Sequence, residues 1–208
     1  MNQEVKVKVR GKMTVCSICS QPGHNRRTCK NILSTTDIQA QCSSEDLRRA
    51  CIGRKADIIR SLIEKGVKPD NLRAKYWNKV LTWASKEGHA DIVKFLIENG
   101  ISPNLKDTDG YTPLIKAAIH GRTDIAKFLI ENGATIDMKN NDGNTALISA
   151  TDGCSNEIAN LLIKKGATIN IQNECLGITP LIGASKNGLT ETVKLLIEKG
   201  ATIDTKDN

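Results

Sequence analysis

A glycine that recurs at an almost constant interval is the feature that most limits how this chain can fold. Gly66, Gly100, Gly133, Gly166 and Gly200 are separated by steps of 34, 33, 33 and 34 residues, and each closes a similar run of apolar and charged residues. Self-similarity at a period of this length is the signature of a solenoid, in which neighbouring repeats stack and bury a shared core. The chain is therefore expected to consist of about five repeats.

The clearest copy runs over residues 109–141, and each part of it has a physical reading. Asp109-Gly110 supplies a turn, because glycine accepts a positive φ. Thr112-Pro113 starts a helix, since the N–H that proline lacks has no partner in the first helical turn. The run from Ile125 to Leu129 places an apolar stripe on a second helix, which Gly133 ends. Each copy therefore predicts a pair of short helices.

The Thr-Pro-Leu start, the Ala-Ala pair and the Ile-Ala-x-Phe-Leu-Ile run closed by Asn-Gly-Ala resemble the ankyrin repeat. The resemblance implies an all-α fold, an ankyrin-repeat solenoid of about five helix-turn-helix repeats. The repeats are expected at about 42–74, 75–108, 109–141, 142–175 and 176–208. The composition of the repeats, rich in Ile, Lys and Asn, is similar to that of ankyrin proteins of giant DNA viruses. This resemblance implies a viral protein.

Several positions depart from the family pattern. Repeat two carries Lys79-Val-Leu81 in place of Thr-Pro-Leu, and its Trp83 is expected in the core. Ile115, Ile148 and Ile182 stand where the family commonly has a histidine that links neighbouring repeats. We expect apolar packing to replace those hydrogen bonds.

Two features concern the last repeat. An extra residue lies within Asn173-Glu-Cys-Leu176, which we expect at a loop tip, where insertions are tolerated. Thr192 stands where the other repeats have an isoleucine, such as Ile158. We expect this polar residue to face water at the end of the array.

Ahead of the repeats, the segment CSICSQPGHNRRTC has the spacing of a zinc site. Cys16, Cys19, His24 and Cys29 are three thiols and one imidazole, and Zn²⁺ takes four such ligands in a tetrahedron. The segment resembles the CCHC zinc knuckle, a small nucleic-acid-binding module, so one structural Zn²⁺ is implied. Ser17 and Ile18 stand where retroviral knuckles often carry a base-stacking aromatic residue, which puts base recognition, but not metal binding, in doubt.

Positive charge is concentrated at the N-terminal end. Residues 1–30 carry a net charge of +6, of the formal +7 for the whole chain. This asymmetry suggests a polyanionic partner for that segment, although a solvated charge run without a partner is the alternative. The candidate nucleic-acid-binding residues are Lys6, Lys8, Arg10, Lys12, Arg26, Arg27 and Lys30.

These features divide the chain into four parts. Residues 1–15 alternate valine with basic residues, which fits a short strand or an arm, and we favour a basic arm because no second strand stands beside it. Residues 16–30 form the expected knuckle, 31–41 a polar linker and 42–208 the repeats. No apolar run of membrane-spanning length and no secretory signal are present. We expect an intracellular protein, in the cytoplasm or nucleus of the expressing or host cell, with Cys42, Cys51, Cys154 and Cys175 as reduced thiols.

No catalytic constellation is evident. The sequence has no nucleophile elbow and no phosphate-cradling glycine loop. His89 stands at a turn between paired helices, and His120 stands at a variable position near the expected binding surface. An enzyme is therefore not expected.

The resemblance implies a binding surface instead. In ankyrin proteins, partners contact the loop tips and the first helix of each repeat, which together form a concave surface. Tyr76 and Tyr111 are the expected anchors, since tyrosine and tryptophan dominate interface energies, and Trp77 is a further candidate. The positions that carry contacts in the family are here Tyr76, Asn78, Lys86, Glu87, Thr108, Asp109, Tyr111, Ile119, His120, Asn141, Asp142, Asn144, Asp152, Glu174, Leu176, Ile178, Lys186 and Asn187.

The leading hypothesis is a non-catalytic, monomeric adaptor that binds a protein through the concave surface, with the knuckle adding a weak nucleic-acid or second protein contact. The alternative is a protein whose main ligand is RNA or single-stranded DNA. A substrate adaptor for a ubiquitin ligase is a third hypothesis, because some viral ankyrin proteins carry an F-box-like tail, but no such tail follows repeat five here.

Overall fold

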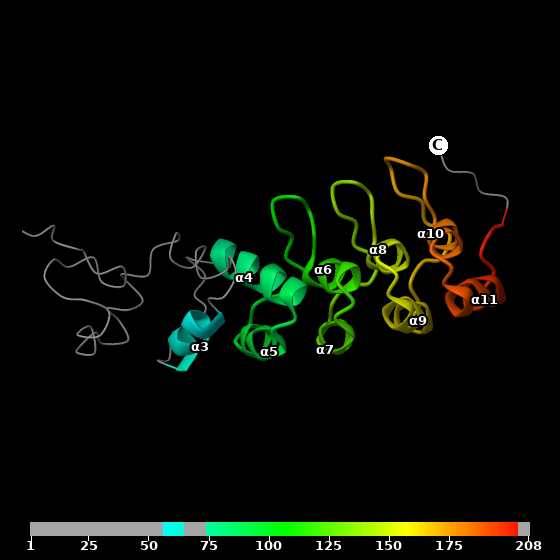
Figure 1. The fold of residues 1–208 in the computed structure, drawn as a ribbon. Helices are drawn as coiled ribbons and strands as arrows, with labels where there is room; N and C mark the ends of the chain where they lie inside the picture. The colour runs from blue at the N-terminus through cyan, green and yellow to red at the C-terminus, as the bar shows by residue number, and fades with distance from the viewer. Residues whose placement is uncertain (1–55, 65–73, 204–208) are drawn as a thin grey trace, which may run out of the picture. The chain divides into compact units, whose positions relative to one another are not determined.

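The computed structural model describes residues 56–64 and 74–203 (Figure 1). The chain divides between Ser43 and Ser44, so every described residue belongs to the second unit. The predicted arm, knuckle and linker, the first helix of repeat one and residues 204–208 lie outside the described residues.

The described part is built from helices, and no strand occurs in it. The helices are α3 (Ala56–Glu64), α4 (Ala74–Glu87), α5 (Ala90–Glu98), α6 (Pro113–Ile119), α7 (Thr123–Glu131), α8 (Ala146–Asp152), α9 (Asn156–Lys164), α10 (Pro180–Lys186) and α11 (Thr190–Glu198). The prediction of an all-α fold is confirmed for these residues.

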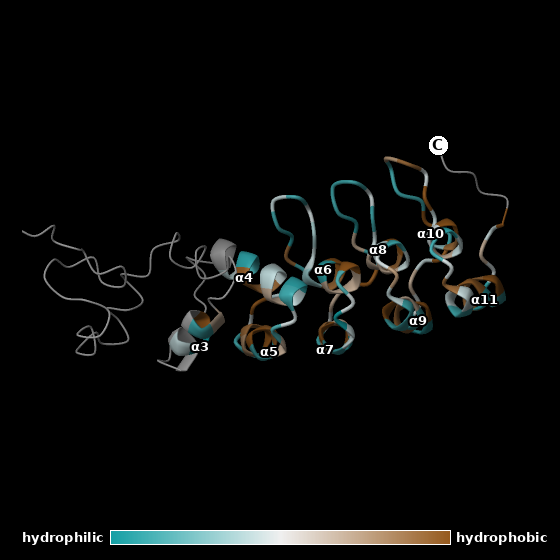
Figure 2. Ribbon diagram, viewed as in Figure 1, coloured by the Kyte–Doolittle hydropathy of each residue, from teal (hydrophilic) through white to brown (hydrophobic). Residues whose placement is uncertain are grey.

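The helices stack in two rows. Each first helix packs on the next, from α4 through α6 and α8 to α10, and the second helices α5, α7, α9 and α11 form a row alongside (Figure 1). In Figure 2 the helices carry most of the hydrophobic colour, whereas the loops before α6 and α8 are mostly hydrophilic. The core therefore lies between the rows and between successive repeats.

Local signals start the short first helices where the sequence predicts. Thr112, Thr145 and Thr179 each precede a first helix, and each side chain accepts a hydrogen bond from the backbone N–H three residues later. This satisfies a donor that the first helical turn would otherwise leave without a partner. Helices α6 and α10 also begin with proline.

Repeat two differs, because its first helix begins earlier than the alignment of Lys79-Val-Leu81 with Thr-Pro-Leu implies. Helix α4 begins at Ala74, so Tyr76 and Asn78 lie in a helix rather than beside a loop glycine. The physical reason is the sequence of α4, AKYWNKVLTWASKE, which contains neither glycine nor proline and is rich in helix formers. Nothing in it stops a helix ahead of Lys79.

The two tryptophans of α4 exchange the roles that the sequence suggested. Trp77, expected on the binding surface, is 1% exposed, and Trp83, expected in the core, is only partly buried. The earlier helix start explains this, because Trp77, Val80, Leu81 and Ala84 follow the i, i+3, i+4, i+7 spacing of one helix face and are all buried. Trp83 lies on the other face.

The isoleucines that replace the family's histidine behave as expected in two repeats of three. Ile115 is 1% and Ile148 2% exposed, so both pack in the core, whereas Ile182 in the last repeat is partly exposed.

The expectation that Thr192 faces water is wrong. Thr192 is fully buried on α11, and its Oγ1 lies 2.7 Å from Asn156 Oδ1 and 3.0 Å from Asn160 Oδ1 on α9. The preceding repeat supplies amide groups to this hydroxyl. A polar residue is buried at this position because the neighbouring repeat satisfies it.

Side chains at the repeat ends join each repeat to the next one. Asn104 Oδ1 accepts from Thr135 N at 2.7 Å, and Asn170 Oδ1 accepts from Thr202 N at 2.9 Å. Asp137 does the same for Thr168 N at 3.0 Å. These bridges recur once per repeat, so the stacking is tied by backbone contacts as well as by apolar packing.

Candidate interaction surface

We use the name concave surface for the loops at residues 107–111, 140–144 and 173–178 together with helices α4, α6, α8 and α10. One polar side chain organises each loop. Asp107 Oδ1 accepts from the backbone N–H of Asp109 and of Tyr111, at 3.0 and 2.8 Å. Asn140 holds its loop in the same way. The loops thus have a fixed local geometry rather than an open turn.

The third loop accommodates the extra residue and keeps the pair of hydrogen bonds to one side chain. Asn173 Oδ1 accepts from Leu176 N and Ile178 N, three and five residues later, instead of two and four. The inserted residue therefore lies in the loop, as the sequence predicted, and leaves Leu176 54% exposed.

The loop tips are also tied to one another. Asn141 N donates to Asp109 O at 3.3 Å, and Glu174 N donates to Asp142 O at 3.2 Å. Gly110 has a φ of +78°, and a Cβ built there would lie 2.7 Å from the backbone N of Asn141. Glycine is required at this tip because the next loop approaches so closely.

The predicted contact residues fall into two strips. At the loop tips, the exposed members are Thr108, Asp109, Asn141, Asp142, Glu174 and Leu176, and the partly buried ones are Tyr111, Asn144 and Ile178. At or near the ends of the first helices, the exposed members are Lys86, Glu87, His120, Asp152 and Lys186, and the partly buried ones are Ile119 and Asn187. Tyr76 and Asn78 belong to neither strip, since both lie near the beginning of α4.

His120, at the end of α6, lies in a positive field. Its pKa is lowered, first by partial burial and then by the charge of Lys86. Glu87 opposes this lowering of the pKa, whereas Arg122 and Lys116 add to it. The cations around this edge therefore outweigh the single carboxylate.

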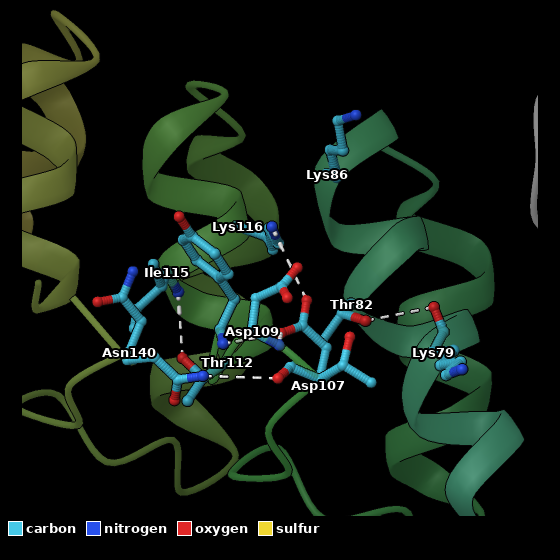
Figure 3. Close-up of polar contacts among 12 residues, drawn as sticks. Lys79, Thr82, Lys86, Asp107, Asp109, Thr112, Ile115, Lys116 and Asn140 are labelled. Atoms are coloured by element: carbon cyan, nitrogen blue, oxygen red, sulfur yellow. Dashed lines mark hydrogen bonds and ion pairs between the residues drawn. The ribbon is translucent and has the colours of Figure 1, made fainter.

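A pocket of about 300 Å³ opens beside α4 and α6. Its lining consists of Lys79, Thr82, Trp83, Lys86, Asp107, Thr108 and Lys116. Figure 3 shows Lys116 of α6 and Asp107 of the preceding loop joined by an ion pair, with Nζ and Oδ2 3.8 Å apart. Lys116 Nζ also lies 3.5 Å from the centre of the Tyr111 ring, a cation–π geometry.

Trp83 lines the pocket, and its ring also contacts a histidine. Its ring packs against that of His89, which precedes α5, with ring centres 4.8 Å apart. Among the described residues, the pocket thus combines an indole surface with three lysines and one carboxylate.

Comparison with protein families agrees with this architecture. Residues 16–107 and 81–173 match the family described as ankyrin repeats (3 copies), and residues 176–208 match the single ankyrin repeat. The chain belongs to the ankyrin repeat family. The first match begins at residue 16 and therefore overlaps the Cys16–Cys29 segment. A search of curated proteins gives no match.

Ankyrin repeats are protein–protein interaction modules, so the family assignment suggests an interaction role for this chain. Lys79, Thr82 and Trp83 were not among the residues that the sequence suggested for it. The signal was present, because Lys79, Thr82, Trp83 and Lys86 share the i, i+3, i+4, i+7 spacing of one helix face. Aligning Lys79 with the Thr of Thr-Pro-Leu hid it by placing Lys79 at the helix start.

The remaining predicted groups are the N-terminal candidates and the cysteines. The expected zinc ligands Cys16, Cys19, His24 and Cys29 and the basic residues from Lys6 to Lys30 lie outside the described residues. Cys154 and Cys175 are free and exposed thiols. Within residues 56–64 and 74–203, no helix has the length and apolar character needed to cross a membrane.

Proposed function

We propose that this ankyrin repeat protein is a non-catalytic adaptor that holds a protein partner on its concave surface. The observation that supports this most directly is the construction of the loop tips. Exposed side chains such as Thr108 and Asp142 lie on loops held by internal hydrogen bonds and by contacts with the neighbouring loop. A surface that is already ordered loses little conformational entropy when it binds, which favours recognition.

Burial supports the same reading. The residues beneath the tips, such as Leu114 and Leu147, are almost completely buried, so no partner is needed to cover them. The exposed residues above them are mostly polar, with Leu176 as an apolar exception, and they differ from repeat to repeat. Such a surface suits a specific and reversible partner.

The test is site-specific photo-cross-linking in the full chain. A photoreactive amino acid replaces Thr108 or Asp142 at the tips, and Lys164, exposed on α9 in the other row, serves as the matched control. We expect the same partner protein to be captured from the two tip positions and not from position 164. Equal capture at all three positions would refute the concave surface as the binding site.

We further propose that Cys16, Cys19, His24 and Cys29 hold one structural Zn²⁺. The donor set supports this, since three thiolates and an imidazole at this spacing match the ligand preference of the ion. Metal analysis should give one zinc per chain, and Cys16→Ser with Cys19→Ser should abolish it, whereas Cys154→Ser should not. Freshly purified protein without zinc would remove the site.

The basic residues around this segment support a weak contact with single-stranded nucleic acid. If they neutralise about six phosphates, the log–log salt slope should be no steeper than about −4. Removal of residues 1–30 should abolish the binding. Binding that persists after this removal would favour the alternative function, with the solenoid itself as the nucleic-acid surface.

A further inference from the structure

The side chains that line the pocket beside α4 determine which kind of ligand it can hold. Lys79, Thr82, Trp83 and Lys86 form one face of α4, and all four line the pocket. The residues of the opposite face, among them Trp77 and Leu81, are buried in the core. Helix α4 is thus anchored on one side and presents two lysines, with a tryptophan between them, on the other.

Two of the three lysines are available to a ligand. Lys116 is engaged by Asp107 and by the Tyr111 ring. Within the described residues, Lys86 pairs only with its sequence neighbour Glu87, at 3.6 Å and with both side chains exposed, a type of pair that contributes little. Lys79 makes no ion pair with any residue of the described part. Its ammonium group and that of Lys86 come from positions two helical turns apart, about 10 Å along the axis.

Asp107, the carboxylate among the described lining residues, does not cancel this charge. Asp107 accepts two loop N–H groups and pairs with Lys116, and its side chain is 16% exposed. Its negative charge is therefore already compensated by neighbouring groups. The pocket keeps an excess of positive charge from Lys79 and Lys86.

We propose that this pocket binds a glutamate or aspartate side chain in an acidic peptide segment of the protein partner. The carboxylate lies between the ammonium groups of Lys79 and Lys86, and the methylene groups pack on the Trp83 ring. The proposal rests on the proposed function, because it specifies the partner of the same concave surface.

The neighbouring loops favour a short acidic peptide over nucleic acid. Thr108 links the pocket to the loop tips, where Asp109, Asp142 and Glu174 are exposed on successive loops. Among these three, Glu174 alone pairs with a lysine in the described part, Lys139 at 3.3 Å. A long polyanion that leaves the pocket across the tips meets like charges, whereas a peptide needs only local negative charge.

The test measures binding of a fluorescent hexaglutamate peptide to the full chain. The variant Lys79→Gln with Lys86→Gln removes from the pocket the two lysine charges that Asp107 does not engage. Lys164→Gln with Lys165→Gln is the matched control, since both residues are exposed near the end of α9 and the net charge changes equally. We expect about a tenfold loss of affinity in the first variant and less than about a twofold loss in the second.

Three further arms define the result. A hexaglutamine peptide should not bind, and added salt should weaken hexaglutamate binding. The fluorescence of Trp83, assigned with Trp83→Phe, should change on binding. Equal losses in the two lysine pairs, or no binding of hexaglutamate, would overturn the proposal. So would a short single-stranded oligonucleotide that binds through Lys79 and Lys86 while hexaglutamate does not.

This outcome is separable from that of the proposed function. If cross-linking from positions 108 and 142 captures a partner but the Lys79/Lys86 variant binds it as well as wild type does, the acidic-peptide proposal fails and the adaptor function stands. If capture from the tips is no more selective than capture from position 164, the adaptor function fails whatever the peptide does.

Discussion

Helices α4 and α6 hold equivalent places in successive repeats, yet they begin in different ways. Helix α6 has seven residues and is capped by Thr112. The loop before it is shaped by Asp107 and Gly110. Helix α4 has fourteen residues, and its own sequence contains neither glycine nor proline. The two helices nevertheless bury matching residues, Leu81 and Leu114, at 0% and 1% exposure. The core pattern therefore fixes how the helix packs, and the cap and turn residues fix where it starts.

The largest expected effect tests the part that the two helices share. Leu81→Ala and Leu114→Ala should each lower the free energy of unfolding by about 2 to 5 kcal/mol, because both side chains are fully packed. Urea unfolding measures the loss, and the exposed Lys127→Ala is the control. A large loss in only one of the two leucine variants would show that the helices do not share a core role.

The next effect tests the loop that precedes α6. Gly110→Ala should cost roughly 2 to 4 kcal/mol, because the new Cβ meets the backbone of Asn141 and the φ is positive. Gly100→Ala has a similar φ of +87° but open space around it, and should cost about 1 to 2 kcal/mol. Equal losses would mean that loop contact adds nothing to backbone strain.

A smaller effect isolates the cap. Thr112→Ala removes the acceptor of Ile115 N, 3.2 Å away, and should cost about 1 kcal/mol. Lys79→Ala, the aligned change in α4, falls inside a helix and should change stability by less than about 0.5 kcal/mol. Thermal unfolding of the two variants side by side provides the measurement. If Lys79→Ala lowered the free energy of unfolding as much as Thr112→Ala, the difference between the two helix starts would be refuted.

The smallest effect concerns the residues that follow the first helices. Gly88, Gly121 and Gly188 have positive φ there, and Cys154 takes the same conformation in repeat four, at +58°. Cys154→Gly should raise the free energy of unfolding by about 0.5 to 1 kcal/mol, since glycine adopts this conformation without strain. Cys154→Ala retains the strain and should give no gain under the same reducing conditions.

Repeats three to five were predictable because each of their elements has its own sequence signal. Thr112, Thr145 and Thr179 mark the helix starts, and the loop glycines mark the tips. The insertion before Leu176 was also placed correctly. These signals are local, so they can be read without knowing which residues come together in the fold.

Repeat two and Thr192 depended on information that is not local. The start of α4 was misplaced because alignment to Thr-Pro-Leu assumed a loop that the sequence does not encode, and this reversed the roles of Trp77 and Trp83. Thr192 was misread because its partners Asn156 and Asn160 come from the previous repeat. The lysine pocket was missed for the first of these reasons, since it depends on which face of α4 is free.

The bridges from Asn104, Asp137 and Asn170 give the array a direction and a set of natural reporters. In each bridge a side chain of the earlier repeat accepts a backbone N–H of the later one, at Thr135, Thr168 and Thr202. These threonines are exposed, so the bridge is a main protection of their amides against exchange with solvent. Hydrogen exchange at these three amides should follow the opening of the junctions one by one. Fraying that begins at the last repeat should release the amide of Thr202 first and that of Thr135 last.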